Sequence, residues 1–222
     1  MEDKCIKFQN STHPLPSSAI CLIKKSGHTL GTGFFAEIFG RRCIITCNHV
    51  LPNRNSVAHC EAYFNSNLTP ENPAKIASCA LSAKRLIVTS PKSQFDPTKL
   101  DYTFVGVDDT AFSAGNSLAK LKPITIDDTV GTVDKEQNIT VYHHPDGSEK
   151  VKVTNGIVTN KYRNKRRTLH ADGPFVEYTA ETKHGSSGGL VTCGGRYQLP
   201  QPQPTLHRIG IIFHSPAHAR DF

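Results

Sequence analysis

The chain lacks the features that would place it in or across a membrane. No run approaches the roughly 18 consecutive apolar residues that indicate a membrane span. The first ten residues, MEDKCIKFQN, do not form a charged start that leads into an apolar stretch and a cleavage site. We therefore expect a soluble protein with no membrane partner and no visible export signal.

The chain also lacks a disulfide framework and a complete metal-binding motif. Its seven cysteines, Cys5, Cys21, Cys43, Cys47, Cys60, Cys79 and Cys193, are odd in number and scattered. This favours reduced thiols and an intracellular protein, cytoplasmic or nuclear. The pair in CIITC is separated by strand-like residues, and no second CxxC or HxxxH pair completes four ligands. We expect no structural metal.

Charge alone assigns no partner. The formal net charge of +7 permits acidic partners, although solubility alone explains it. The densest basic run is KYRNKRR, from Lys161 to Arg167. We favour a solvated turn between strands over a nucleic-acid patch, because such short runs are weak signals. A basic nucleic-acid-binding protein that uses Arg163, Arg166 and Arg167 stays open as an alternative.

Long helical patterns are scarce, and short strand-like segments recur instead. A chain of 222 residues with 37% hydrophobic content can bury a core. The stretch HTLGTGFFAEIF, a GRR turn and CIIT predict a hairpin. Later strands are predicted at LDYTFVGV, NITVYHH, KVTNGIVTN, FVEYTA, GGLVTC and HRIGIIF. This indicates an all-β protein, a sandwich or a barrel.

A polar stretch divides these strands into two groups. DDTAFSAGNSLAKLKP, from Asp108 to Pro123, contains Gly115 and Asn116 and ends at a proline. It is the best candidate for a connector between two lobes, which we place at residues 1–115 and 116–222. Near the end, GGRYQLPQPQPTLHR carries three prolines, which predicts a surface loop.

Three stretches supply the parts of a nucleophilic site. A serine hydroxyl needs a neighbouring base, a group that orients the base, and donors aimed at the developing oxyanion. His49 follows an apolar strand in IITCNHVL, and Asp101 opens LDYTFVGV. Ser187 holds the third place of G-x-S-G-G. The backbone N–H groups of Gly185 and Ser187 are the predicted oxyanion hole, since glycine can adopt backbone angles closed to other residues.

At this point the chain resembles a trypsin-like serine peptidase of the chymotrypsin fold. The order His, Asp, Ser is that of this family, whereas α/β-hydrolases and subtilisins use other orders. The motifs GTGFFAE, IITCNHVL, GSSGGLV and RIGIIFHS carry the resemblance, and VYHHPDGSEKVKVTNGIVT is similar to the disulfide-poor high-temperature-requirement and V8-type branches. It also resembles intracellular eukaryotic trypsin-like peptidases. The resemblance implies two packed six-stranded antiparallel β-barrels with the active site between them.

Two departures and one decoy affect this interpretation. Secreted trypsins have a cysteine after the histidine and an aspartate before the serine, where this chain has Val50 and Ser186. The resemblance therefore implies no disulfide there and no activation by a newly cleaved amino terminus. The motif SVAHC around His59 mimics the digestive-enzyme histidine motif, but it follows the polar LPNRN rather than a strand, so His49 is preferred.

The resemblance implies a serine endopeptidase that hydrolyses protein or peptide substrates through an acyl-enzyme and needs no cofactor. Family alignment places Glu181 and Thr182 near the base of the primary substrate pocket, which favours Lys or Arg in the substrate. His214, on the strand that lines the pocket, favours an acidic side chain instead. A catalytically inactive binding module on the same scaffold stays open as an alternative. The oligomeric state is not determined by the sequence.

Overall fold

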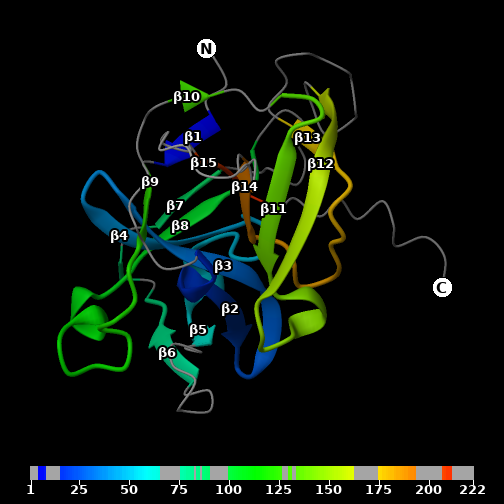
Figure 1. Ribbon diagram of the computed structural model, residues 1–222. Coiled ribbons are helices and arrows are strands. Elements are labelled where there is room, and N and C mark those ends of the chain that lie inside the picture. The colour runs from blue at the N-terminus through cyan, green and yellow to red at the C-terminus, as the bar shows by residue number, and fades with distance from the viewer. Residues whose placement is uncertain are drawn as a thin grey trace, which may run out of the picture.

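The chain is built almost entirely of antiparallel β-strands. The computed structural model describes residues 5–8, 16–65, 76–82, 84–85, 87–90, 100–126, 130–131, 134–162, 175–193 and 207–211. Within them the strands form one sheet of eight and one of seven (Figure 1). Helical structure in the described residues is confined to the four-residue α1 (Arg54–Val57) and three short 3-10 turns, η1 (Pro16–Ala19), η2 (Asp109–Phe112) and η3 (Pro145–Gly147). No helix in these ranges is long and apolar enough to cross a bilayer.

The first sheet holds the strands that precede and follow the predicted histidine. Its path is β6-β5-β2-β3-β4-β8-β7, with β9 paired to β3 in parallel. The strands are β2 (Ile20–Lys25), β3 (His28–Ile38), β4 (Arg41–Thr46), β5 (Cys60–Asn65), β6 (Ile76–Ala80), β7 (Ile87–Thr89), β8 (Thr103–Gly106) and β9 (Ile124–Ile126). The hairpin predicted from the sequence is β3 and β4, joined by a turn at residues 39–40.

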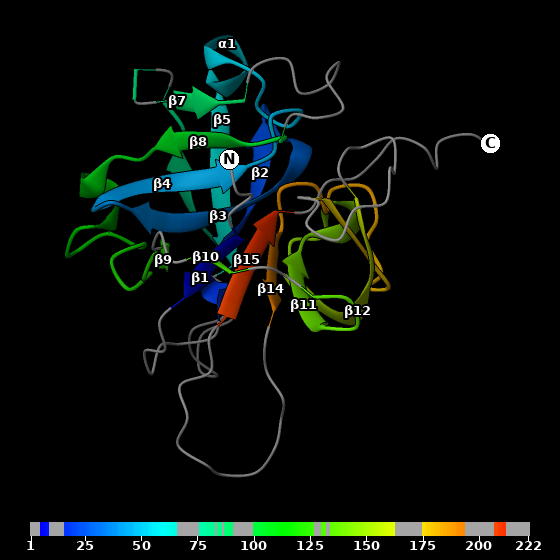
Figure 2. The ribbon, with the colours of Figure 1, turned by 90° about the horizontal axis from the view of Figure 1, so that it is seen from above.

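The second sheet holds the strands around the predicted nucleophile. Its order is β10-β1-β15-β14-β11-β12-β13. The strands are β1 (Cys5–Phe8), β10 (Val130–Gly131), β11 (Asn138–His143), β12 (Lys152–Tyr162), β13 (Phe175–Tyr178), β14 (Leu190–Cys193) and β15 (His207–Ile211). Figure 2 shows the early strand β1 beside the late strand β15, as their pairing requires. Each of the later predicted strands is present.

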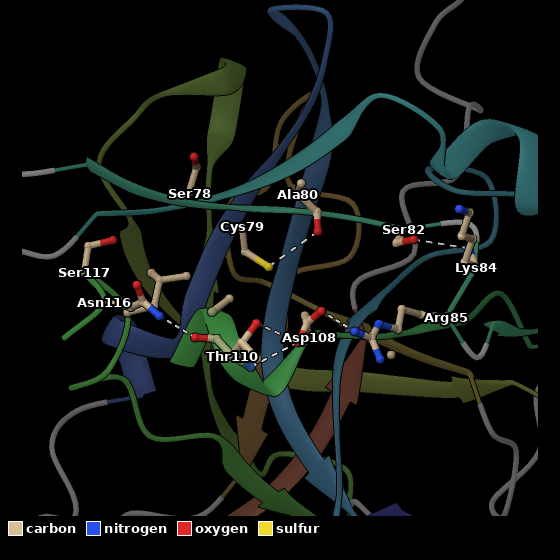
Figure 3. Close-up of a pocket in the computed structure, with 13 residues that line it drawn as sticks. Ser78, Cys79, Ala80, Ser82, Lys84, Arg85, Asp108, Thr110, Asn116 and Ser117 are labelled. Carbon is tan, nitrogen blue, oxygen red and sulfur yellow. Dashed lines mark hydrogen bonds and ion pairs between the residues drawn. The ribbon is translucent and has the colours of Figure 1, made fainter. Parts of the chain in front are cut away.

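The all-β, chymotrypsin-like prediction is confirmed, but the sheets are not closed six-stranded barrels. In the described residues of the first sheet, no ladder joins the end strands β6 and β7. The three-residue β7 pairs with the Thr103–Val105 part of β8 and reaches no further. At the open seam between β6 and β8 lies a cavity of about 740 Å³ (Figure 3). The Arg85–Asp108 ion pair lies at its edge.

The predicted connector is packed onto the first sheet instead of standing apart as a linker. Phe112 stacks on Phe35 with ring centroids 4.1 Å apart, and Leu118 and Leu121 are buried in the same core. The segment leads into β9, which pairs with β3. The polar composition of the segment gave no indication that Phe112, Leu118 and Leu121 pack into the core.

Strand membership departs from the proposed lobes at two strands. Strand β1 lies in the second sheet although it precedes the proposed boundary at residue 115, and β9 lies in the first sheet although it follows that boundary. The division into 1–115 and 116–222 stays a prediction. Of the seven cysteines, the five whose side chains are described, Cys21, Cys43, Cys47, Cys60 and Cys79, are buried and are not joined in disulfides.

Candidate active site

Strand register brings His49 and Asp101 together. Thr46, the last residue of β4, pairs with Thr103, the first residue of β8. His49 follows Thr46 by three residues, and Asp101 precedes Thr103 by two, so both side chains leave the same end of an antiparallel pair. His49 and Asp101, which are 52 residues apart in the sequence, thus become neighbours.

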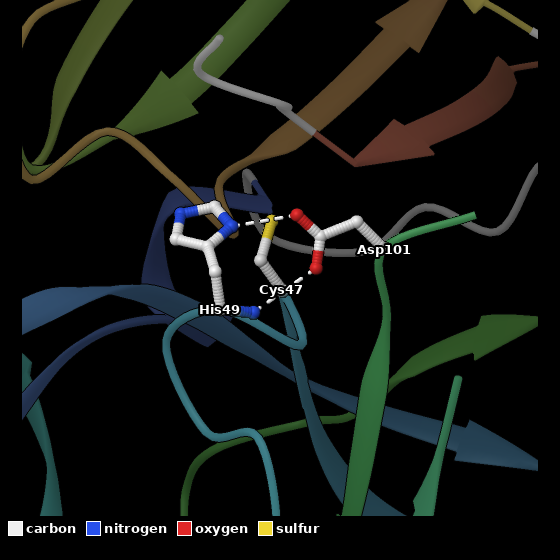
Figure 4. Close-up of side chains that lie close together, drawn as sticks. All are labelled: Cys47, His49 and Asp101. Atoms are coloured by element: carbon white, nitrogen blue, oxygen red, sulfur yellow. Dashed lines mark hydrogen bonds and ion pairs between the residues drawn. The ribbon is translucent and has the colours of Figure 1, made fainter. Parts of the chain in front are cut away.

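The two side chains are in direct contact. Nδ1 of His49 lies 2.6 Å from one carboxylate oxygen of Asp101, and the other oxygen accepts the His49 backbone N–H at 3.0 Å (Figure 4). A carboxylate only accepts hydrogen bonds, so in the neutral ring the proton is on Nδ1 and Nε2 keeps its lone pair. The Asp101 side chain is 9% exposed and that of His49 is 32% exposed. This geometry produces a base with a fixed tautomer.

Neighbouring polar side chains hold the histidine turn against β7 and β8. The buried Asn48 donates its amide to the hydroxyl of Thr89 at 2.6 Å. The hydroxyls of Thr89 and Thr103 are 2.6 Å apart, and that of Thr103 donates to the Leu51 carbonyl at 2.8 Å. These bonds satisfy the polar groups of a buried turn and limit its movement.

His59 of the decoy motif is located elsewhere. It follows α1, has a positive φ of 63° and is exposed. It lines a cavity of about 420 Å³ together with Lys24, Glu61 and Tyr63. The carboxylate of Asp101 is bonded to His49, which agrees with the choice of His49 from its preceding strand.

Two consecutive tight turns form the loop that carries Ser187. The Ser186 N–H donates to the Lys183 carbonyl and the Gly189 N–H to the Ser186 carbonyl, each at 3.0 Å. The third residue of each turn is a glycine with positive φ, 85° at Gly185 and 88° at Gly188. A turn with this backbone requires glycine at that place. The glycine pattern of HGSSGG therefore encodes both turns.

Ser187 is anchored to β3 of the first sheet. Its carbonyl accepts the Thr32 N–H at 2.8 Å. A Cβ at Gly188 would lie 2.0 Å from the Thr32 carbonyl oxygen, and one at Gly31 would lie 2.9 Å from the Ser187 oxygen and 2.8 Å from a methyl of Val50. The Ser187 backbone and the residue after His49 thus approach the same point on β3.

Thr32 joins the two sheets through its side chain as well. Its buried hydroxyl donates to the Gly185 carbonyl at 2.7 Å and accepts the His144 N–H at 3.0 Å. Its own carbonyl accepts the hydroxyl of Thr46 at 2.7 Å. One threonine therefore ties the end of β4, the loop after β11 and the Ser187 loop to each other.

The η3 turn fixes the orientation of the peptide before Gly185. The backbone N–H of Asp146 donates to the His184 carbonyl at 2.6 Å. In a trans peptide the C=O and N–H of one unit point in opposite directions, and the described residues contain no cis peptide bond. The Gly185 N–H therefore points away from η3.

A chain of hydrogen bonds with the buried His143 at its centre starts and ends within the 181–186 loop. The hydroxyl of Ser186 accepts the Lys183 N–H at 3.0 Å and lies 2.7 Å from Nδ1 of His143. Nε2 of His143 lies 3.3 Å from the hydroxyl of Thr154, which donates to the Glu181 carbonyl at 3.2 Å. Because the amide only donates and the carbonyl only accepts, the consistent arrangement has Ser186 donating to Nδ1 and a neutral His143 protonated on Nε2.

Burial keeps the histidines beside this loop neutral. His143 is 1% exposed, and burial lowers its pKa to about 4. Burial likewise lowers the pKa of the neighbouring His144 to about 4. Its Nδ1 lies 2.7 Å from the Ser148 carbonyl, and its buried Nε2 meets no hydrogen-bond partner among the described residues. Both shifts disfavour the charged form of the ring.

The residues predicted to select the substrate are only partly described. Glu181 is 61% exposed at its side chain, and its carboxylate lies 3.6 Å from Lys152 and 3.8 Å from Lys183. Thr182 is half-buried beside it. His214 lies outside the described residues, as do Arg163, Arg166 and Arg167 of the basic run. The predicted roles of these residues in substrate or nucleic-acid binding stay predictions.

Comparison with known families agrees with this geometry. The model of the trypsin-like peptidase domain matches residues 31–195, well over half of the chain. The chain belongs to the trypsin-like peptidase domain family. The match includes His49, Asp101 and Ser187, which are the residues that the sequence motifs selected.

Individual relatives of this trypsin-like peptidase domain are distant. The uncharacterized protein y4fB of Sinorhizobium fredii is 26% identical over 162 residues, which are 72% of this chain. The chain spans 23% of that relative's length. The match to the crystal structure of Deg5 covers 82% of this chain and 80% of the Deg5 chain. With 16% identity and a TM-score of 0.50, it shows a shared fold. The match to the MamO protease domain from Magnetospirillum magneticum covers 89% of this chain and 94% of the MamO chain, with 11% identity and a TM-score of 0.48.

Proposed function

We propose that the chain is a serine endopeptidase with Ser187 as nucleophile, His49 as general base and Asp101 as the group that orients the base. His49 accepts the hydroxyl proton of Ser187 through Nε2 as the oxygen attacks a peptide carbonyl, then returns it to the leaving amine. Asp101 stabilises the imidazolium that forms. Water then hydrolyses the acyl-enzyme by the same route, and the substrate is a protein or peptide.

The observation that carries the proposal is the contact between His49 and Asp101. A 2.6 Å bond from Nδ1 to a buried carboxylate, reinforced by a second bond to the His49 backbone, is what a general base needs in order to keep Nε2 available. The anchoring of the Ser187 carbonyl on Thr32, close to Val50, supports a nucleophile on the same side of β3.

The loop backbone supports the proposed oxyanion hole. The Asp146 N–H holds the His184 carbonyl, and the Thr32 hydroxyl holds the Gly185 carbonyl. Both peptide units that flank Gly185 are therefore fixed before substrate binds. Donors that need no reorganisation during the reaction stabilise the oxyanion most effectively.

A fluorophosphonate probe tests the nucleophile directly. The wild-type chain should be labelled covalently, Ser187→Ala should not, and the exposed serine variant Ser113→Ala should be labelled like the wild type. Peptide mapping should place the adduct on Ser187. An unlabelled wild type, or an adduct on another serine, would contradict the proposal and favour a binding module on the peptidase scaffold.

Substrate preference is proposed only at the level of charge. We expect cleavage after Lys or Arg, weakened by Glu181→Gln. The Lys152 and Lys183 ammonium groups already share this carboxylate, so the expected loss is about tenfold at most. A profile of cleaved peptide libraries measures this, with Glu149→Gln as the exposed control. A preference for large apolar or acidic residues would contradict it.

A further inference from the structure

The side chain of Cys47 faces the proposed catalytic pair. Cys47 follows β4 directly and is fully buried. Its Sγ, a side-chain nitrogen of His49 and a carboxylate oxygen of Asp101 all lie within 4.8 Å of one another. Figure 4 shows the sulfur beside the hydrogen bond that joins the other two side chains. Burial, with a smaller contribution from the charge of a Cys47 thiolate, raises the pKa of Tyr178 on β13 of the second sheet.

We infer that Cys47, His49 and Asp101 form an inhibitory zinc site. The inhibition rests on the proposed peptidase function, whereas the binding of zinc does not. A thiolate, an imidazole and a carboxylate are three preferred ligand types of Zn²⁺. Ligands of one tetrahedral zinc lie about 2.0–2.3 Å from the metal and about 3.5 Å from each other. The present spacing requires adjustments of about 1 Å, within reach of side-chain rotation.

Charge balance favours zinc over the common hard cations. The thiolate and the carboxylate together neutralise the 2+ charge of the ion, so a buried site would carry no net charge. Sulfur and nitrogen donors favour Zn²⁺, while Mg²⁺ and Ca²⁺ prefer oxygen ligands. The His49 side chain is 32% exposed and provides the route of entry, with water as the fourth ligand.

Zinc at this position would remove the general base. On binding, the thiol of Cys47 loses its proton to solvent, zinc takes the place of the proton on Nδ1 of His49, and that proton moves through solvent to Nε2. A neutral imidazole with a metal on Nδ1 carries its proton on Nε2. That nitrogen can no longer accept the hydroxyl proton of Ser187. Inhibition should therefore appear mainly as a lower kcat and should be reversed by a chelator.

Peptidase activity is the first test. After treatment with EDTA, the wild type is assayed on a fluorogenic peptide with increasing Zn²⁺, and with Mg²⁺ and Ca²⁺ at the same concentrations. We expect at least a tenfold fall in kcat with zinc alone. In Cys47→Ala the half-inhibiting zinc concentration should rise at least tenfold, while Cys43→Ala, a buried cysteine on the preceding strand, should behave as the wild type. Equal inhibition of the two variants would overturn the inference.

Cobalt spectroscopy tests the site without using activity. Co²⁺ bound to a thiolate gives a sulfur-to-metal charge-transfer band in the near ultraviolet, which Ser187→Ala and Cys43→Ala should show and Cys47→Ala should lack. Absence of this band from the Ser187→Ala chain would overturn the zinc site, even if the wild-type chain is an active peptidase. If no activity is found but the band appears, the proposed function fails and the metal site stands. Circular dichroism checks that each variant is folded. If Cys47→Ala does not fold, Cys47→Ser takes its place as the variant without the thiol.

Discussion

The Ser186 hydroxyl lies 2.7 Å from Nδ1 of His143, in a buried contact at the end of β11. In secreted trypsins an aspartate stands at the place of Ser186, so here a neutral hydrogen bond occupies the position of a charged group. The bond joins the loop before Ser187 to the end of β11. We therefore expect the loop to hold its shape without a charged group at position 186.

Replacing Ser186 should weaken both stability and activity. Ser186→Ala leaves the buried Nδ1 of His143 without its partner and removes the acceptor of the Lys183 N–H, which costs about 2 kcal/mol of unfolding free energy. The loosened loop should lower kcat about tenfold or more. Urea denaturation and peptide hydrolysis measure the two effects. Ser113→Ala removes an exposed hydroxyl and is the control; equal behaviour of the two variants would contradict the structural role of Ser186.

Stability should fall as the pH drops from about 6.5 towards 4. The pKa values of His143 and His144 are lowered from 6.5 to about 4, so in this window the unfolded chain binds protons that the folded chain does not. At higher pH both states are neutral and the effect disappears; below about 4 it levels off. Each histidine contributes at most about 3 kcal/mol.

Urea denaturation between pH 7 and 4.5 measures this slope. His143→Asn places an amide oxygen near the position of Nδ1 and removes one titrating group, so the slope should fall by about half. Lys152 and Glu181 are the charged neighbours of His143, and Lys24 is that of His144. An unchanged slope in His143→Asn would show that other groups cause the acid sensitivity.

Gly188→Ala should be among the most damaging single substitutions. The added Cβ would lie 2.0 Å from the Thr32 carbonyl oxygen, on a backbone with a φ of 88°. Strain and overlap together should cost about 3 kcal/mol or more. Gly27→Ala has a similar φ of 84° and no atom within 4 Å of its Cβ, so it measures strain alone. Thermal unfolding of both variants separates the two terms, and a small, equal loss would argue against close packing at Gly188.

Thr32→Val should lower kcat more than it changes KM. The substitution keeps the shape of the side chain and removes the bonds to the Gly185 carbonyl and the His144 N–H. A displaced Ser187 loop should reduce kcat about 10- to 100-fold. Thr140→Val, which loses a bond to Asn155 at the surface, is the matched control. If Thr32→Val retains full activity, the hydroxyl does not position the loop.

The sequence predicted the strands and the turns of the Ser187 loop well because their signals are local, whereas the catalytic roles stay predictions. Gly185 and Gly188 mark two turns by their spacing, and His49 stands directly after an apolar strand. Thr32, His143 and Asn48 were not predicted, since their roles depend on pairing between distant strands. A threonine between two glycines in GTG, or an asparagine next to the histidine, carries no local mark of such contacts.

The packing of the connector and the closure of the barrels could not be predicted from local sequence patterns. Phe112, Leu118 and Leu121 are dispersed among polar residues, so composition indicated a linker where the structure has a packed segment. Closure of a barrel depends on whether two end strands pair, and among the described residues no ladder joins β7 to β6. Pattern alone does not reveal strand length at that precision.

The position of β1 sets a minimum size for a folded form of this domain. The family match begins at residue 31 and ends at 195, which excludes β1, β2 and β15. A recombinant protein trimmed to those limits would separate β3 from β5, detach β10, and expose the edge of β14 to aggregation. Expression boundaries should therefore lie outside both terminal strands.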